Sequence, residues 1–375
     1  MKKKLLIFHP AMAPYRVDQF NSLSKLFNLE VVFIFENVEN NNFDQSELLS
    51  LLEFKYSFLL KGLIIKGRVF RFGIYNKIKR FNPDIILGYE YSFITQYLIF
   101  LKRIGFIHQR IGSTIDDSLE ICKHVQSKGR YFARKISVTK LDLLIVMSNE
   151  VSIFYQKTFN IKPYQIVVSP ILQDSERLRK DKDKLEFIAN QYSIKYSLKG
   201  KKVLLYVGRF SSEKGLIRFI NTIHSILQNQ KHLVLVIIGN GEDKKALEDL
   251  LIEKSLRKKV ILPGRYEGLE LNAWYICSSG FVLPSTYEPF GAVVNEALIF
   301  GLKVFCSKYA GSSYLVSNEK GLLFDPLSEK DTINKLNIFL NEIEIFENVN
   351  LMNNPSLMSN HNNKFLLEWS KLIDK

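Results

Sequence analysis

From about residue 201 onward, short apolar runs alternate with amphipathic stretches of helical period. We predict strands at 202–207, 232–238, 260–262 and 281–283, each followed by a helix. The runs are continuously apolar, which is typical of strands that are covered on both faces of a sheet. Strands that alternate with helices in this way form a parallel sheet with helices on both sides. The C-terminal half is therefore predicted to be a doubly wound α/β domain.

The N-terminal half repeats this alternation less regularly. Strands are expected at 4–8, 30–35, 84–88, 105–111, 142–147 and 166–168, with helices near 15–27, 72–80, 92–103, 119–139 and 149–159. Because 375 residues exceed what one core usually carries, we predict Rossmann-like domains at 1–175 and 200–345, joined by a charged connection over 174–200. A final helix within 360–375 is expected to pack back on the first domain. Two such domains face each other across a cleft, and ligands bind at the carboxyl ends of the strands.

With 46% hydrophobic and 24% charged residues, the composition is that of an ordinary globular protein. The basic start resembles a signal peptide, but His9 and Pro10 limit the following apolar run to four residues, which is too short for one. No uninterrupted apolar run approaches the roughly 18 residues that a spanning helix needs. Cys122, Cys277 and Cys306 have neither metal-site spacing nor an even count, so we expect isolated thiols in a reducing cytoplasm.

The basic residues behind the net charge of +14 concentrate in residues 61–80, where no acidic residue occurs. Apolar residues alternate there with Lys61, Lys66, Arg68, Arg71, Lys77, Lys79 and Arg80. Such a basic and apolar segment suits an anionic membrane surface, which predicts a peripheral protein on the inner face of the plasma membrane. A solvated helix whose apolar side packs on its own domain explains the segment equally well. Because no recognised nucleic-acid-binding motif accompanies the charge, we expect no nucleic acid partner.

Glu288 and Glu296 flank a Pro-Phe-Gly turn at the predicted start of a helix. Residues 280–284 before it are predicted to be a buried strand, so the turn lies at the strand's carboxyl end. The free N–H groups of residues 291–294 and the helix dipole favour an anion there. The carboxylates would repel an anion, whereas they can accept hydrogen bonds from sugar hydroxyls. The stretch thus predicts a site for a sugar joined to a phosphate, with two solvated glutamates as the alternative.

A basic pair, Arg209 and Lys214, follows the first strand of this half. The pair can converge on one diphosphate, since Arg209 offers a planar fork and Lys214 a point charge, although a solvated helix cap also explains it. Gly239 ends the next strand in a Gly-Asn-Gly turn, which either lets a nucleotide approach the backbone or is a plain turn. After the third strand, backbone groups or the ring of Tyr266, next to Arg265, can hold a base.

Taken together, these motifs resemble the nucleotide-sugar domain of retaining GT-B glycosyltransferases, the glycosyl transferases group 1 (family 4). The resemblance covers about 200–340 in detail and the rest of the chain more loosely. It rests on Gly208-Arg209 to Lys214-Gly215, Pro284-Ser285 to Glu288-Pro289-Phe290-Gly291, Asn295-Glu296-Ala297 and Gly301. The fold that it implies is GT-B, an α/β fold of two Rossmann-like doubly wound domains facing across a cleft.

By that resemblance, Arg209 and Lys214 neutralise the donor diphosphate, Glu288 binds the sugar hydroxyls, and Glu296 binds the ribose hydroxyls. Further donor contacts are implied for Gly208, Gly239, Arg265, Tyr266, Phe290, Gly291, Ala292, Val293 and Val294. The implied reaction moves a hexose or N-acetylhexosamine, with retained configuration, from a nucleotide sugar, UDP being favoured by family frequency. The acceptor is a hydroxyl of a lipid-linked glycan or of a polysaccharide, lipopolysaccharide or capsule glycan. Neither a cofactor nor a metal is expected.

The acceptor side offers fewer signals. Family members often carry a glycine pair in the first loop, where this chain has His9-Pro10-Ala11-Met12-Ala13-Pro14-Tyr15-Arg16. Arg16, Glu90, Asp116 and Asp117 are the candidates for contacts with the acceptor or the donor sugar. For Asp116 and Asp117, capping of the following helix is the favoured role. His108, in an apolar strand context, is interpreted as structural.

Two other functions compete with transfer. The same fold serves a sugar-nucleotide epimerase or hydrolase, and a basic membrane-surface protein with an inactive cleft would share the charge pattern. The intact set of Arg209, Lys214, Glu288 and Glu296 argues against the inactive cleft. For the transfer reaction, attack of the acceptor on the leaving-group face and a covalent enzyme intermediate both remain open.

Overall fold

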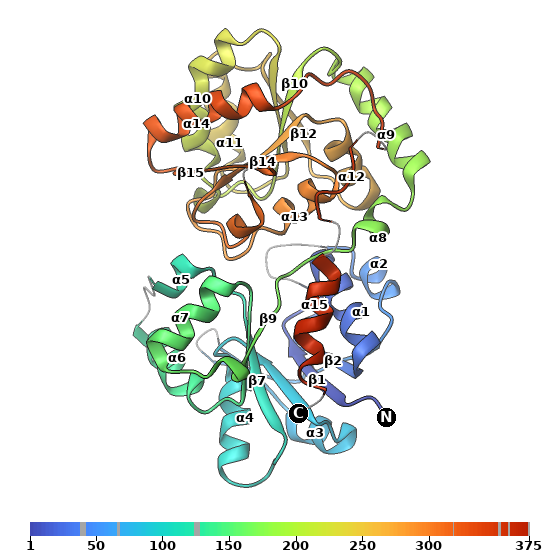
Figure 1. The fold of residues 1–375 in the computed structure, drawn as a ribbon, viewed down its shortest axis with the longest axis vertical. Coiled ribbons are helices and arrows are strands. Elements are labelled where there is room, and N and C mark those ends of the chain that lie inside the picture. Colours follow the sequence, from blue (N-terminus) through green and yellow to red (C-terminus); the bar gives the residue numbers. More distant parts are fainter. Residues whose placement is uncertain are drawn as a thin grey trace. The chain divides into compact units, whose positions relative to one another are not determined.

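The structure, a computed structural model, describes residues 1–37, 43–65, 68–123, 128–317, 319–351, 354–358 and 361–373 (Figure 1). The chain forms two compact units, unit 1 with Met1–Gln173 and Asn360–Lys375 and unit 2 with Asp174–Ser359. Each unit has its own parallel sheet with helices packed against it. The predicted architecture of two Rossmann-like α/β domains is therefore confirmed. No helix in the described ranges is long and apolar enough to cross a membrane.

The sheet of unit 1 is parallel throughout. Its strands follow the order β3 (Lys55–Phe58), β2 (Asn28–Phe33), β1 (Lys4–His9), β6 (Ile85–Tyr89), β7 (Arg110–Ile115), β8 (Leu143–Val146) and β9 (Ile166–Val168). Along β1, Leu5 and Ile7 belong to the core on one face of the sheet, and Leu6 and Phe8 to the core on the other. The strand order changes direction between β1 and β6, and ligands bind at the carboxyl ends of the strands beside such a switch point.

Helices cover both faces of this sheet. They are α1 (Val17–Leu26), α2 (Gln45–Ser50), α3 (Ile74–Phe81), α4 (Phe93–Arg103), α5 (Leu119–Lys123), α6 (Lys128–Val138), α7 (Asn149–Phe159) and α15 (His361–Ser370), with 3-10 turns at Pro14–Arg16 and Pro163–Gln165. The C-terminal α15 lies in unit 1, where the indole N–H of Trp369 donates to the hydroxyl of Ser169 over 2.9 Å. Because Phe365, Trp369 and Leu372 are buried in the same core as α1, the end of the chain completes one face of the sheet.

The predictions for two segments of unit 1 were wrong in their boundaries. The strand expected at 105–111 is β7 at Arg110–Ile115, because α4 ends in a turn at Gly105, which has a φ of +77°. His108 lies in the loop that follows and is exposed, so it is no structural residue of a strand. The helix expected over 119–139 is divided into α5 and α6, with 124–127 outside the described residues.

The basic segment 61–80 forms an antiparallel hairpin followed by a helix. The hairpin consists of β4 (Gly62–Ile65) and β5 (Arg68–Arg71), and α3 begins at Ile74. A helix is therefore wrong for the first half of the segment and correct for its second half. Lys66 and the side chain of Arg68 lie outside the described residues.

Unit 2 contains a second parallel sheet. Its order is β12 (Val260–Gly264), β11 (Leu233–Ile238), β10 (Lys202–Val207), β13 (Gly280–Leu283), β14 (Lys303–Ser307) and β15 (Gly321–Phe324). The four strands predicted from the apolar runs are confirmed as β10 to β13. Here the switch point lies between β10 and β13, so the loops that leave these two strands flank the expected ligand position.

The helices of unit 2 are α8 (Ser175–Arg179), α9 (Lys182–Lys195), α10 (Leu216–Asn229), α11 (Lys244–Glu253), α12 (Gly268–Ile276), α13 (Ala292–Ile299) and α14 (Glu329–Glu342), with 3-10 turns at Ser212–Lys214 and Ser313–Leu315. The region 174–200, predicted as a charged connection, is thus mostly helical. Asp174 caps α8 by accepting the N–H groups of Glu176 and Arg177. In α9, Leu185, Ala189 and Tyr192 form a buried stripe, and Tyr192 stacks on Trp274 of α12 at 4.5 Å. The many charges of α9 conceal this stripe in the sequence.

Candidate active site

The loops that leave β10 and β13 are in direct contact. The carbonyl of Glu213 in the first loop accepts the N–H groups of Thr286, over 2.9 Å, and Tyr287, over 3.3 Å, in the second. A Cβ atom on Gly215, whose φ is +65°, would lie 2.4 Å from the carbonyl oxygen of Pro284. This position therefore requires glycine. The basic loop and the carboxylate loop, 74 positions apart at Lys214 and Glu288, form one local structure.

At the centre of this structure, Lys214 forms an ion pair with Glu288. The ammonium of Lys214 donates to Oε2 of Glu288, and the hydroxyl of Ser285 donates to the same oxygen over 3.4 Å. Glu288 is buried, and the N–H of Gly311 holds its carbonyl at 3.0 Å. Since a carboxylate can accept about four hydrogen bonds, Glu288 retains capacity for a ligand's hydroxyl groups. The structure thus brings together two of the predicted residues in a fixed geometry.

Arg209 of the same loop forms a second ion pair, with Glu213. Its Nη2 lies 2.9 Å from Oε1 of Glu213, which also accepts the hydroxyl of Ser211 over 2.7 Å. Partial burial would raise the pKa of Glu213, but the hydrogen bond from Ser211 and the charge of Arg209 outweigh it and lower that pKa. The guanidinium side chain is 42% exposed, so it can reach an added anion. Each cation of the predicted basic pair therefore contacts a carboxylate.

The N-terminus of α13 lies beside Glu288. Gly291 caps the helix with a φ of +89°, and a Cβ atom there would lie 2.9 Å from Oγ of Ser312. The predicted set of free N–H groups at 291–294 needs one correction, because the N–H of Val294 donates to the carbonyl of Gly291 over 3.0 Å. The N–H groups of Ala292 and Val293 lie in the first turn, where the helix provides no carbonyl acceptor for them, so they can bind an anion.

Glu296 lies in the second turn of α13 and contacts α12. Its Oε2 accepts the hydroxyl of Tyr275 over 2.7 Å. Burial and the nearby Glu296 carboxylate raise the pKa of Tyr275 well above its ordinary value, so the phenol stays a donor. The predicted carboxylate pair thus consists of a buried residue joined to Lys214 and a partly buried one joined to a tyrosine.

The turn after β11 lies against the turn after β10. A Cβ atom on Gly239, which has a φ of +145°, would come within 1.9 Å of the carbonyl oxygen of Gly208. The N–H of Gly208 donates to Ile238 over 3.0 Å, and the N–H of Gly239 donates to Gly264 over 2.9 Å. The ends of β10, β11 and β12 are therefore joined into one backbone surface next to Arg209.

The predicted base contacts lie farther from the switch point than the two joined loops. Arg265 and Tyr266 follow β12, two strands away from β10 in the sheet order. Arg265 forms an ion pair with Glu267. The ring of Tyr266 packs edge-on against Tyr192 at 5.6 Å and Trp274 at 5.9 Å, so part of it belongs to an aromatic cluster with α9 and α12.

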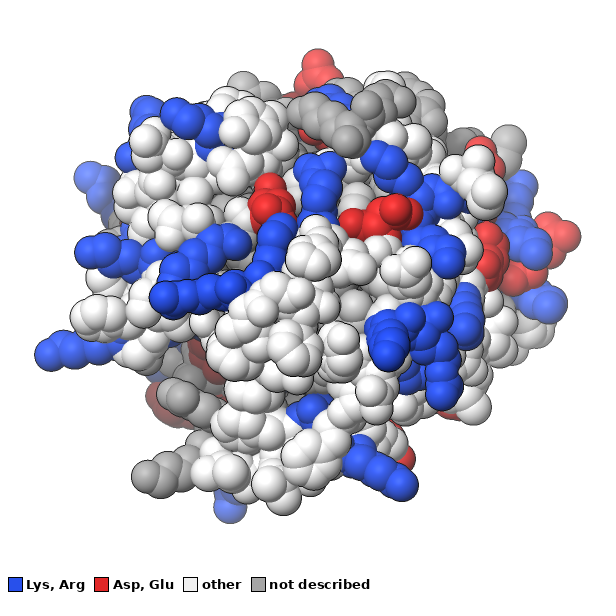
Figure 2. Space-filling model, turned by 90° about the horizontal axis from the view of Figure 1, so that it is seen from below, with Lys and Arg blue, Asp and Glu red and all other residues white. Residues whose placement is uncertain are grey.

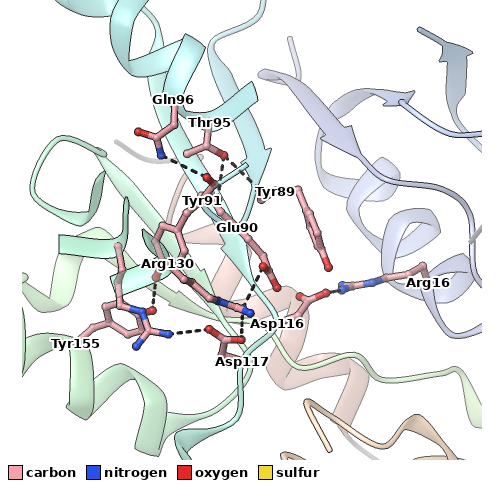
Figure 3. A network of polar contacts seen from close by, with 12 residues as sticks. Arg16, Tyr89, Glu90, Tyr91, Thr95, Gln96, Asp116, Asp117, Arg130 and Tyr155 are labelled. Atoms are coloured by element: carbon pink, nitrogen blue, oxygen red, sulfur yellow. Dashed lines mark hydrogen bonds and ion pairs between the residues drawn. The ribbon is translucent and has the colours of Figure 1, made fainter. Parts of the chain in front are cut away.

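In unit 1, the predicted acceptor-side residues gather at the carboxyl ends of β6 and β7 (Figure 3). Arg130 of α6 contacts Glu90 at 3.1 Å and Asp117 at 2.6 Å, and Arg134 contacts Asp117 at 2.9 Å. Arg16, which is buried, forms an ion pair with Asp116. All four predicted residues thus lie in a network of alternating charges beside the switch point between β1 and β6.

The favoured role of Asp116 and Asp117 as helix caps is wrong. The hydroxyl of Ser118 accepts the N–H of Ile121 in the first turn of α5, over 3.3 Å. Both aspartates have arginine partners instead. Arg130 and Arg134 were not predicted as site residues; their spacing of four places them on one helix face, and Asp117 contacts both.

Glu90 combines a strained backbone with an unusual ionisation. Its φ of +45° is rare for a residue with a side chain. The conformation is held by β7, because its N–H donates to Thr114 over 2.8 Å and its carbonyl accepts the hydroxyl of Ser113. Burial raises the pKa of the Glu90 carboxyl to about 7, against the opposing charge of Arg130. A carboxyl that titrates near neutral pH can accept or donate a proton at a site.

We expect Glu90→Gln to change how stability depends on pH. The pKa of Glu90 in the folded protein lies above its ordinary value, so the folded state binds the proton more tightly and loses stability as pH rises towards 7. The glutamine variant lacks this contribution, which amounts to as much as about 3 kcal/mol. Urea unfolding between pH 5 and pH 8 measures it. A parallel pH profile for Glu90→Gln and the native protein would contradict the assignment, and the exposed Glu150→Gln serves as control.

Within the described parts of the chain, no three His, Cys, Asp or Glu side chains are grouped so that they could hold a metal ion. The cation that contacts Glu288 in the described structure is the ammonium group of Lys214.

Comparison with known proteins gives one family match. Residues 190–350 match the sequence model of the family described as glycosyl transferases group 1. An uncharacterized glycosyltransferase of Methanocaldococcus jannaschii is 35% identical over 32% of this chain, and a 2-deoxystreptamine N-acetyl-D-glucosaminyltransferase of Niallia circulans is 24% identical over 44%. These alignments span 30% and 43% of the two relatives' own lengths.

Solved structures resemble the whole chain. The Anabaena protein HepE in complex with UDP and glucose has a TM-score of 0.71 and 15% identity, covering 99% of both chains. The lipopolysaccharide outer core galactosyltransferase WaaB has a TM-score of 0.64 and 18% identity, covering 98% of this chain and 99% of its own. At such low identity these likenesses show the fold. Residues 190–350 are therefore similar to the glycosyl transferases group 1 family, and the two units have the GT-B fold of these structures.

Proposed function

We propose that the protein is a retaining glycosyltransferase whose donor is a nucleoside diphosphate sugar, favoured to be a UDP-sugar. It moves a hexose or N-acetylhexosamine to a hydroxyl of a lipid-linked, polysaccharide or lipopolysaccharide acceptor. The observation that carries the proposal is the joined pair of loops after β10 and β13. They hold two cations, the buried carboxylate of Glu288 and the N-terminus of α13 at the switch point of one sheet.

The diphosphate is assigned to the cations and the helix end. Arg209 and Lys214 carry the positive charge, and the N–H groups of Ala292 and Val293 add donors that point out of the helix. Glycine at positions 208 and 239 leaves the backbone beside Arg209 without side chains, so phosphate oxygens can approach it closely. HepE binds UDP and glucose on the same fold, which supports this type of donor.

The sugar is assigned to Glu288. Its carboxylate is held in place by Lys214 and Ser285 and accepts hydrogen bonds from hydroxyls of the sugar. When the diphosphate binds, it shares Lys214 with Glu288, which ties the position of the sugar to that of the phosphate. Glu296, whose carboxylate accepts hydrogen bonds, is assigned to the ribose hydroxyls.

Transfer breaks the bond between the anomeric carbon and the diphosphate oxygen and forms a bond from that carbon to the acceptor oxygen. Negative charge grows on the departing diphosphate, where Arg209, Lys214 and the helix dipole stabilise it. The proton of the acceptor hydroxyl passes to the departing phosphate. Attack from the side of the leaving group keeps the configuration of the sugar.

The acceptor is assigned to unit 1. Arg16, Glu90, Asp116 and Asp117 lie at the carboxyl ends of its strands, and sugar hydroxyls can exchange hydrogen bonds with such alternating charged groups (Figure 3). The strained Glu90 is the best candidate for a direct contact in this network.

Incubation with a panel of UDP- and GDP-sugars, with and without a lipid-linked or oligosaccharide acceptor, tests the proposal. We expect one donor to release its nucleotide only when an acceptor is present, and the product to keep the anomeric configuration. Arg209→Ala should slow this release about a hundred-fold, because it removes a charge-assisted contact to the leaving group. Arg257→Ala, on an exposed loop of unit 2, is the matched control and should leave the rate unchanged.

The same incubation distinguishes transfer from the two competing reactions of the donor. Nucleotide release without acceptor would indicate a hydrolase, and conversion of the donor sugar without any release would indicate an epimerase. Full activity of Arg209→Ala would contradict the assigned diphosphate site.

A further inference from the structure

We propose that the β4–β5 hairpin and the adjoining ends of α3 and α4 form a docking surface for an anionic membrane. This surface is called the hairpin face below. It is independent of the transfer reaction, and it lies on unit 1 alone.

The hairpin exposes apolar side chains on both of its sides. Leu63, Ile64 and Ile65 are 53%, 69% and 52% exposed. Because side chains alternate along a strand, Leu63 and Ile65 point to one side and Ile64 to the other. Exposed apolar side chains of this size gain free energy when they leave water for an apolar phase.

An aromatic ladder connects the hairpin to α4. Phe70, which pairs with Leu63 across the hairpin, lies 4.2 Å from Phe93, and the contacts continue through Tyr97 to Phe100 at 6.0 and 6.4 Å. At the end of α4, the ring of Phe106 lies 5.7 Å from Tyr75 of α3. The hairpin, α3 and α4 are thereby packed into one structure.

The same elements present further exposed apolar side chains. Phe72 between the hairpin and α3, and Phe100, Ile104 and Phe106 at the end of α4, are all about half exposed or more. Figure 2 looks at the end of unit 1 that carries α3 and α4, and it shows wide uncharged areas bordered by Lys and Arg. Apolar surface of this extent on a single protein marks an interaction site.

The charge of the hairpin face is positive throughout. Neither residues 59–83 nor residues 91–115 contain an acidic residue. Not every basic side chain there is available, since Arg71 donates to the carbonyls of Leu60 and Ile34 and Lys77 contacts Glu30 at 3.8 Å. Among the described side chains of this face, the exposed cations are Lys61, Lys79, Arg80 and Arg103. Part of the basic segment predicted from the sequence therefore supports the fold, and the exposed cations are the ones that can contact a lipid surface.

Apolar side chains surrounded by cations are complementary to a lipid surface with anionic headgroups. The apolar groups enter the boundary of the acyl chains, and the cations contact the headgroups. Each cation contributes roughly a five-fold gain in partitioning to the membrane. Nucleic acid would engage the cations and leave the apolar groups in water. The combination therefore favours the membrane.

Co-sedimentation of the full chain with vesicles tests the proposal. Vesicles of phosphatidylcholine alone are compared with vesicles that also contain phosphatidylglycerol, at low and high salt. We expect strong binding to the anionic vesicles that weakens with salt. Lys79→Gln with Arg80→Gln should lower it roughly thirty-fold. Leu63→Ser with Ile64→Ser should lower it at least about ten-fold, because exposed apolar side chains no longer enter the lipid.

Matched controls come from unit 2. Lys244→Gln with Lys245→Gln neutralises an exposed pair on α11, and Ile194→Ser removes an apolar side chain that is 81% exposed on α9. Neither should change vesicle binding. An Ile64→Trp variant adds a direct readout, since its emission should shift to the blue with anionic vesicles.

Three results would overturn the proposal. The first is equal binding to neutral and anionic vesicles. The second is unchanged binding of the variant with Leu63→Ser and Ile64→Ser. The third is self-association of the native protein in solution that this variant abolishes while its vesicle binding stays the same. Thermal unfolding of each variant shows whether it is folded, and the Ile64→Trp shift does not depend on loss of function.

Discussion

Replacement of Glu288 by glutamine is expected to lower the rate of sugar transfer about a thousand-fold while nucleotide affinity stays within a few-fold of the native value. Glutamine keeps the shape of the side chain but removes the charge that strengthens hydrogen bonds to the sugar. Loss of two charge-assisted bonds of about 1.5–3 kcal/mol each accounts for the size of the effect. Steady-state rates with the donor found in the panel, together with calorimetric titration of the free nucleotide, measure both quantities.

The control for this substitution is Glu342→Gln. Glu342 also forms a pair with a lysine of unit 2, Lys303, at 3.3 Å, but this pair lies on the surface between β14 and α14. Its loss should change the rate less than about two-fold, as is usual for exposed pairs. If Glu288→Gln instead weakens nucleotide binding and leaves the rate of bound donor unchanged, the sugar is not the partner of Glu288.

Gly239→Ala is expected to abolish nucleotide binding and to destabilise unit 2. The added Cβ would stand 1.9 Å from the carbonyl oxygen of Gly208, so the turns after β10 and β11 must move apart. The φ of +145° is also unsuited to a residue with a side chain. The combined cost should be about 3 kcal/mol or more of unfolding free energy. Urea unfolding and a nucleotide titration of the folded variant measure the two effects.

Gly200→Ala separates backbone strain from crowding. Gly200 also has a positive φ, of +76°, but an added Cβ there meets nothing within 4 Å. It should cost only about 1–2 kcal/mol and leave nucleotide binding unchanged. Normal binding by Gly239→Ala would contradict a role of this turn in the donor site.

The fold of unit 2 could be predicted well because its strands are covered on both faces. An apolar run such as 233–238 is stable only when it is buried, and the glycines that follow such runs show where the backbone turns. The same reasoning located the loops after β10 and β13. It could not show that Glu213 joins these two loops. The contact is made by the backbone carbonyl of Glu213, and the residue type gives no information about backbone contacts.

The candidate site in unit 1 was harder to predict. Asp117 reaches Arg134 across 17 positions, and Arg16 reaches Asp116 across 100. Such pairs depend on how α6 and the first loop pack against the sheet, which local sequence does not encode. A pattern of acidic residues before a helix therefore resembled caps, whereas the helix is capped by Ser118.

The basic segment shows a third kind of limit. Its composition indicated a charged surface, but composition cannot tell an exposed lysine from one that supports the fold. Lys77 and Arg71 contact Glu30 and backbone carbonyls, while Lys79 and Arg80 face solvent. The alternation of Leu63 to Ile65 was also compatible with a helix, and only pairing with β5 shows a hairpin.

Amide hydrogen exchange of the native chain, with and without saturating UDP or GDP, tests the placement of the donor most directly. The account predicts that one nucleotide slows exchange in peptides from residues 208–216 and 284–296. These segments carry the cations, Glu288 and the N-terminus of α13, and the diphosphate contacts their N–H groups. Slowed exchange confined to unit 1, or unchanged exchange in both segments with either nucleotide, would contradict it.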